Sequence, residues 1–243
     1  MSRPLSTNVT RGVVIALGLI GVASALLRYV VPHDLHVAIT RPLLGAYATE
    51  QLAVLMREPV SEASHRIGGM LYLVLGLWQL APGVRGRWPT FRRWGGRVFV
   101  SLALIASVSG AAIAALHPFV PGERAPSFLF ATLLIAFTVL GVRRARAGDI
   151  ERHREWMIRG FAVGLGIATI RVIGVALTLG TNLPTRSFVA PTFWAGWCST
   201  LLAAEVWIRI QRGSLAYSPP SEPLGPGLRV RGPTNVGRLD EGS

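Results

Sequence analysis

The chain has 243 residues, of which 51% are hydrophobic and 15% are charged, and its formal net charge is +13. A soluble domain of this length carries more charge and shorter apolar runs, so the composition argues against an ordinary soluble enzyme. All the basic residues are arginines, and most lie in short segments beside long apolar stretches. That placement excludes a nucleic-acid-binding protein and indicates basic loops that set membrane topology and contact anionic lipid.

Six apolar stretches divide the chain, and most reach the length that a helix needs to cross a bilayer. They cover residues 12–31, 63–83, 97–117, 127–142, 157–180 and 190–208. We therefore predict an all-α, polytopic membrane protein, a bundle of six transmembrane helices. Arginine is concentrated in alternate segments between the stretches, namely 1–11, 84–97, 143–159 and 209–243, which hold 18 of the 25 basic residues. By the positive-inside rule these segments and both termini are cytoplasmic, as in a multi-pass protein of a bacterial inner membrane.

Residues 1–11 form the predicted cytoplasmic N-terminus, and residues 12–31 the first transmembrane helix. Ala23-Ser24-Ala25 resembles a signal-peptide cleavage site, but the apolar run is long enough to span, which favours a retained helix. Residues 32–62 form the one long external loop. In it, Leu44, Ala48, Leu52 and Leu55 recur at helical spacing, which predicts a short amphipathic helix on the outer surface that ends at Pro59.

Residues 63–212 form the predicted five-helix membrane core. Residues 213–243 are rich in Ser, Pro and Gly and contain too little apolar surface to fold, so we predict a disordered cytoplasmic tail.

Small residues mark the helix faces that turn toward the bundle interior. Three stretches carry such a stripe: His65, Gly69, Tyr72, Gly76 and Gln79 on the second, Gly96, Ala103, Ser107, Gly110 and Ala114 on the third, and Gly160, Gly164 and Ala168 on the fifth. The third stripe leads to His117, and the fifth shares its face with His153 and Arg171. The glycines are explained by packing alone, but they indicate that these polar side chains face inward.

Arg171 is the most informative single residue, because it lies about 14 residues, or roughly 21 Å, from the inner end of its stretch. A charged arginine at that depth costs at least about 2.5 kcal/mol and needs a partner, so it is either a functional group or a hydrogen-bonded structural one. Glu205 is the acidic residue of the sixth stretch. We expect it near the inner boundary in an ion pair with Arg159 or Arg97, which enter at similar depth.

Two histidines, His65 and His117, are expected at similar depth on antiparallel neighbouring helices, near the outer boundary. Two imidazoles that face each other across a bundle can ligate haem b, although polar boundary residues are the simpler explanation. His33 and His36 form a weak H-x-x-H signal, and no C-x-x-C-H motif for covalent haem is present. We predict no separate metal site, nor any motif for nucleotide or hydrolytic chemistry.

Several segments resemble a bacterial family of predicted membrane proteins catalogued as domain of unknown function twenty-three-oh-six. The resemblance covers about residues 60–210 and rests on residues 64–69 and 75–79, 93–99, 153–159 with Arg171, and Trp197 with Ala204-Glu205. It marks as signature positions His65, Gln79, Arg97, His153, Arg159, Arg171 and Glu205. This chain departs from the family pattern at Arg92, where the family has a histidine. The family name implies no activity.

Three functions are compatible with these observations. The first is a redox or haem-related membrane protein, whose cofactor site near the outer side consists of His65, His117 and Arg171, with Arg171 holding a propionate or a quinone oxygen. The second is a small proton-coupled transporter with Arg171, Gln79 and Glu205 along its path. The third is a non-catalytic scaffold or assembly factor, in which Gln79, Arg97, His153, Arg159 and Glu205 only hold the bundle interior together.

Overall fold

The structure is a computed structural model, and it describes residues 5–44, 49, 53, 56–80, 89–116 and 122–216. Within these residues it consists of seven α-helices and no strands. The helices are α1 (Leu5–Val30), α2 (His33–Leu44), α4 (Pro59–Leu80), α6 (Pro89–Leu116), α7 (Arg124–Arg146), α8 (Ile150–Gly180) and α9 (Thr185–Ala216). The prediction of an all-α protein is confirmed.

The chain divides into two compact units, residues 1–208 and 209–243. The second unit is described only to Ala216, where α9 ends, so the helix extends four residues into the predicted tail. The remainder of that tail lies outside the described residues.

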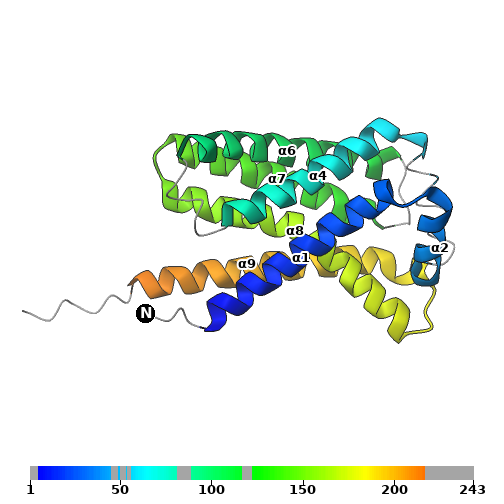
Figure 1. The fold of residues 1–243 in the computed structure, drawn as a ribbon. Coiled ribbons are helices and arrows are strands. Elements are labelled where there is room, and N and C mark those ends of the chain that lie inside the picture. Colours follow the sequence, from blue (N-terminus) through cyan, green and yellow to red (C-terminus); the bar gives the residue numbers. More distant parts are fainter. Residues whose placement is uncertain are drawn as a thin grey trace, which may run out of the picture. The chain divides into compact units, whose positions relative to one another are not determined.

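The helices of the first unit pack mostly against their neighbours in the sequence (Figure 1). Helix α4 lies against α6, α6 against α7, and α7 against α8, while α1 packs on both α4 and α8. Aromatic and small side chains fill the centre, with Tyr72 stacked on Phe99 at a ring-centroid distance of 4.3 Å. Helix α9 joins α8 through Trp197, whose Nε1 donates a hydrogen bond of 3.1 Å to the carbonyl of Val163.

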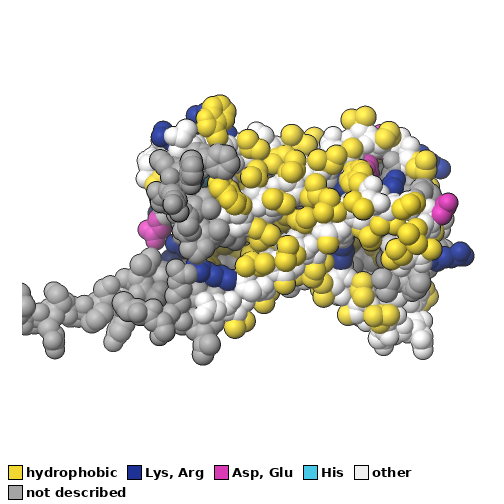
Figure 2. All heavy atoms as spheres, in the orientation of Figure 1, with side chains coloured by type: hydrophobic (Ala, Val, Ile, Leu, Met, Phe, Trp, Pro, Cys, Tyr) yellow, Lys and Arg dark blue, Asp and Glu magenta, His cyan; other side chains and the backbone are white. Residues whose placement is uncertain are grey.

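In the part of the chain that the structure describes, four helical segments are long and apolar enough to cross a membrane: Asn8–Val30, Arg92–Leu116, Arg124–Arg146 and Ile150–Gly180. Helices α4 and α9 do not qualify by composition among the described residues, because their sequences include polar and charged groups. Each nevertheless exposes an apolar face, with Ile67, Leu71 and Val74 on α4 and Leu202 and Val206 on α9. On the face shown in Figure 2, apolar side chains cover the middle of the helices, and charged ones lie toward the two ends. This is the surface of a membrane protein with several candidate transmembrane helices.

The small-residue stripes face the interior in part. A Cβ atom on Gly76, Gly110 or Gly164 would meet a side chain of a neighbouring helix, whereas one on Gly69 or Gly96 would have no neighbour within 4 Å. Ala103 of α6 and Ala168 of α8 are completely buried. A Cβ atom on Gly164 would lie 2.5 Å from the ring of Tyr72, so only glycine lets α4 and α8 approach this closely.

The connection between α1 and α4 differs from the prediction. Helix α2 forms at His33–Leu44, where no helix was predicted, and Pro59 begins α4. Met56 and Arg57 are helical and Glu58 is not, so a helical segment ends just before Pro59, as the sequence predicts. Proline is favoured in the first turn of a helix, because its missing N–H would have no intrahelical partner there. Most residues of the predicted amphipathic helix, among them Ala48, Leu52 and Leu55, lie outside the described residues.

Candidate functional site

His65 lies near the N-terminus of α4 and points toward α6. Its Nδ1 is 2.8 Å from the carbonyl oxygen of Ala106, and since a carbonyl can only accept, Nδ1 carries the proton. In the neutral ring the other nitrogen, Nε2, then holds a lone pair, and no hydrogen bond joins it to a described residue. A Cβ on Gly110 would lie 2.8 Å from the imidazole, so the glycine makes the space in which the ring sits.

Arg171 is half-buried on α8, nine residues before the end of that helix at Gly180, or about 14 Å. It is thus nearer the end of the bundle that holds His65 than the opposite end. Arg66 of α4 lies near enough for its positive charge to act on the Arg171 guanidinium. Both arginines also lie close enough to His65 for their charges to act on its ring. The structure thus brings together His65 and Arg171, two of the three predicted cofactor residues. His117, the third, lies outside the described residues.

The same end of the bundle contains a buried carboxylate that the sequence did not single out. Glu62 is 7% exposed and forms an ion pair with Arg66, one turn further along α4. The hydroxyl of Tyr29 on α1 donates a hydrogen bond of 3.2 Å to the other oxygen of Glu62. The carboxylate is therefore shared between α1 and α4, and we call Arg28, Glu62, His65, Arg66 and Arg171 the outer cluster.

Arg28 belongs to this cluster because it lies on the face of α1 that packs against α4. Gly18 and Gly21 face α4, where a Cβ on either would meet Leu77 or Leu73, and Ala25 is buried on the same face. Arg28 follows at the next helical position of that face. Its Nε is buried, and no described residue accepts its hydrogen bond.

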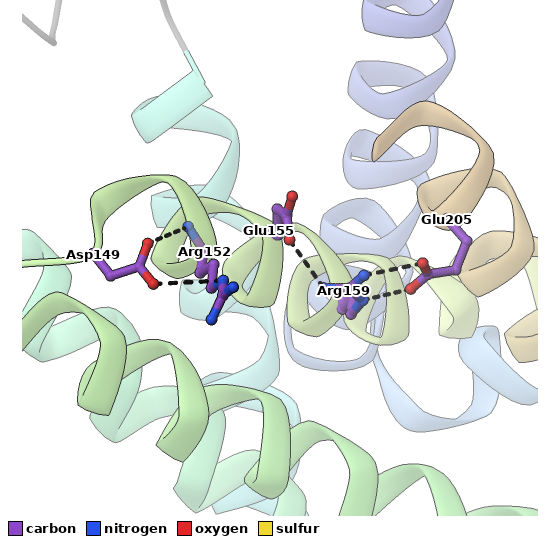
Figure 3. Close-up of polar contacts among 5 residues, drawn as sticks. All are labelled: Asp149, Arg152, Glu155, Arg159 and Glu205. Atoms are coloured by element: carbon purple, nitrogen blue, oxygen red, sulfur yellow. Dashed lines mark hydrogen bonds and ion pairs between the residues drawn. The ribbon is translucent and has the colours of Figure 1, made fainter. Parts of the chain in front are cut away.

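A second polar cluster lies at the opposite end of the bundle (Figure 3). Arg159 of α8 forms a two-pronged ion pair with Glu205 of α9, and its Nη2 lies 3.0 Å from Oε2 of that carboxylate. The predicted pairing of Glu205 is thereby confirmed, with Arg159 as its partner. Glu155, one turn earlier on α8, lies 3.8 Å from the same guanidinium, which also stacks over the ring of Trp156 at 4.7 Å.

Residues 62–208 match the family described as "Predicted membrane protein (DUF2306)". The chain belongs to the DUF2306 family. No curated protein and no solved structure matches it. Both polar clusters of this DUF2306 protein fall within the matched region, except for Arg28 and Tyr29, which α1 contributes.

The remaining signature residues of this DUF2306 protein are separated from the outer cluster. His153 lies at the start of α8 and binds α7, with its Nδ1 2.9 Å from the carbonyl oxygen of Gly141. Gln79 is half-buried near the end of α4, and no described residue bonds to its buried Nε2. Arg97, expected in the bundle interior, is exposed and stacks over Trp94 at 4.9 Å. The exposed ring of Trp94 lets this arginine stack on an aromatic surface and keep its charge in water, which explains the difference.

The sequence did not reveal Glu155, Glu62 or the pairing of Arg66. Helix α8 begins at Ile150, seven residues before the predicted stretch, so Glu155 is also a carboxylate of a membrane helix. The signal that could have found both acids is the spacing of four residues that separates each from its arginine, since side chains at that spacing are neighbours on a helix. The outer cluster ends up with three guanidiniums and one carboxylate, whereas the inner one has two carboxylates around one guanidinium.

Proposed function

We propose that this DUF2306 protein crosses a bacterial inner membrane six times, with both termini in the cytoplasm. The arginine distribution supports this topology, as do the apolar exposed faces of α4 and α9. In this arrangement the polar groups of α4 face protein and its apolar groups face lipid. That division lets a helix of modest average hydropathy span the bilayer.

Single-cysteine labelling in cells tests the topology, in a Cys198→Ser background that removes the exposed native thiol. A membrane-impermeant maleimide is expected to label Asn182→Cys in intact cells. Ala147→Cys, in the connection between α7 and α8, should become reactive only after lysis. The opposite pattern would reverse the orientation, and equal labelling of both before lysis would exclude the six-span arrangement.

We further propose that the protein is a redox protein that binds haem b at the outer cluster. The observation that carries this proposal is the hydrogen bond from His65 Nδ1 to the Ala106 carbonyl. Histidines that ligate a metal typically donate their other ring N–H to a carbonyl or carboxylate, which fixes the ring and its tautomer. His65 has this arrangement, on a rigid helix and beside a glycine that leaves room for the imidazole.

In this proposal His65, through Nε2, and His117 would hold the haem iron. Arg171 holds an acidic or oxygen-bearing group of the cofactor by charge-assisted hydrogen bonds. The bound haem would supply one-electron transfer. The surrounding apolar helices would exclude water from the iron and so tune its reduction potential.

The absorbance spectrum of the purified protein tests this function. A Soret band is expected in the native protein, and His65→Ala should abolish it. His153→Ala is the matched control, because His153 has the same carbonyl contact at the other end of the bundle and should leave the band unchanged. A colourless protein that also takes up no added haem would refute the proposal, and an equal loss in both variants would indicate unfolding instead of ligation.

A proton-coupled transporter is the second candidate, favoured by buried polar atoms without partners among the described residues. The hydroxyl of Tyr72 and Nε2 of Gln79 are both such atoms, and they lie on one face of α4, two helical turns apart. Proton uptake into liposomes that contain the protein, at a rate lowered by Gln79→Leu, would support this candidate. If the protein neither binds haem nor transports protons, the non-catalytic scaffold is the function that remains.

A further inference from the structure

The last two turns of α7 border a groove at the end of the bundle where α8 begins, opposite to the outer cluster. The described residues that line its volume of about 420 Å³ are Leu140, Arg143, Arg144 and Ala147. Their spacing of three and four residues places them on one face of the helix. Small-molecule sites in proteins occupy about 300–1,000 Å³, so the groove is large enough to hold a ligand group. We call it the inner groove.

The positive charge of the inner groove is only partly balanced. Nη1 of Arg144 lies 3.6 Å from Oδ2 of Asp149, and Nε of Arg152 lies at the same distance from that oxygen (Figure 3). One carboxylate is thus shared by two guanidiniums. Arg143 is exposed, and no hydrogen bond or ion pair joins it to a residue that the structure describes. A negatively charged ligand in the groove would balance this charge.

The two arginines of the groove are not needed to complete the end of α7. The last carbonyls of a helix have no intrahelical partner, and arginine side chains often bind them. Here the carbonyls of Arg143, Arg144 and Ala145 accept hydrogen bonds of 3.0–3.1 Å from the backbone N–H groups of residues 147–149. The guanidiniums therefore remain available to a ligand.

The inner groove also has an apolar wall on its membrane side. Helix α7 is a candidate transmembrane helix, and its basic residues lie in its last turn. Leu140 lies about 4.5 Å deeper than Arg143 along the helix, and the neighbouring Val139 is exposed. A phospholipid has the same order of groups, with its acyl chains and glycerol beneath its phosphate. This match favours a lipid over a small soluble anion.

We propose that the inner groove binds an anionic phospholipid through its phosphate. Arg143 donates charge-assisted hydrogen bonds to the phosphate oxygens, Arg144 adds positive charge, and Leu140 contacts the glycerol and the first acyl carbons. Basic segments beside membrane helices attract anionic lipid in general. A groove goes further, because it makes one arginine more important than its neighbours. The inference does not depend on haem, since the groove and the outer cluster lie at opposite ends of the bundle.

Thermal unfolding of the full-length protein in a neutral detergent tests the proposal. Dioctanoyl phosphatidylglycerol, at ten times its dissociation constant, is expected to raise the melting temperature by about 3–6 °C. Dioctanoyl phosphatidylcholine should raise it much less, because its choline group would bring a positive charge to the arginines. Arg143→Gln should weaken the binding of phosphatidylglycerol about 10-fold, the effect of losing one charge-assisted hydrogen bond. Arg146→Gln is the matched control, because it removes the same charge from an exposed arginine of the same turn that does not line the groove.

Each alternative gives a different result, and each overturns the inference. Equal shifts with phosphatidylglycerol and phosphatidylcholine, or no shift with either, would exclude a site for anionic lipid. An equal loss of affinity in Arg143→Gln and Arg146→Gln would show that the overall charge attracts the lipid without a specific groove. Equal stabilisation by glycerol 3-phosphate would assign the groove to a soluble phosphate compound. None of these results depends on whether a Soret band is present, so this inference and the proposed function can fail separately.

Discussion

Replacing Arg159 with methionine is expected to destabilise the protein more than neutralising Glu205. The guanidinium of Arg159 is 14% exposed and pairs with both Glu205 and Glu155, whose side chains are 33% and 10% exposed. Arg159→Met therefore deprives two carboxylates of their shared partner. Glu205→Gln leaves Arg159 with Glu155 and with the ring of Trp156.

The expected loss of folding free energy in each variant depends on how deeply the ion pair is buried. Removing one member of a buried ion pair costs about 3–5 kcal/mol, and we expect the lower end, about 3 kcal/mol, for Arg159→Met, because Glu205 is partly exposed. For Glu205→Gln we expect about 1 kcal/mol, the value for a partly exposed pair with a remaining partner. For a protein of this size, these values correspond to decreases in melting temperature of about 6–12 °C and about 2–4 °C.

Thermal unfolding of the purified protein in one detergent, followed by circular dichroism, measures both variants and the double variant. The double variant should be more stable than the sum of the single effects predicts, by about 1 kcal/mol, since the partners interact directly. Arg152→Gln is the control, because its pair with Asp149 lies at the surface and contributes at most about 0.5 kcal/mol. The reasoning fails if Glu205→Gln is as costly as Arg159→Met, or if the two changes are additive.

Four further substitutions test the packing of the bundle. Gly164→Ala should destabilise the protein by about 1–3 kcal/mol, because the new methyl group would overlap the ring of Tyr72. Gly69→Ala, where nothing lies within 4 Å, should instead stabilise it by up to about 1 kcal/mol, and a melting curve that reverses this order would contradict the helix packing. Tyr72→Phe should be neutral or stabilising, since the buried hydroxyl has no described partner, and a clear loss of stability would reveal one. Trp197→Phe should cost about 1 kcal/mol through its bond to Val163, and an unchanged melting temperature would count against that bond.

Much of the fold can be predicted from the sequence, because membrane helices are defined by local composition. Each apolar stretch appears as a helix, but several helices extend beyond the stretch: α1, α6 and α8 begin seven or eight residues early, and α9 ends eight residues late. The small-residue faces with Ala103 and Ala168 are also local, since a period of 3.6 residues decides which positions share a side. The Arg159–Glu205 ion pair could be predicted from the sequence, because few arginines are expected at the depth of Glu205 in the membrane.

The outer cluster depends on contacts that no local pattern encodes. Tyr29 and Glu62 are 33 residues apart, and His65 and Ala106 are 41 apart, so each contact depends on how whole helices rotate and slide against one another. The sequence by itself determined that the chain consists of apolar helices and which of their faces turn inward. Only the tertiary structure decided that Tyr29 of α1 and Arg66 of α4 share the carboxylate of Glu62, because that depends on the packing of α1 against α4.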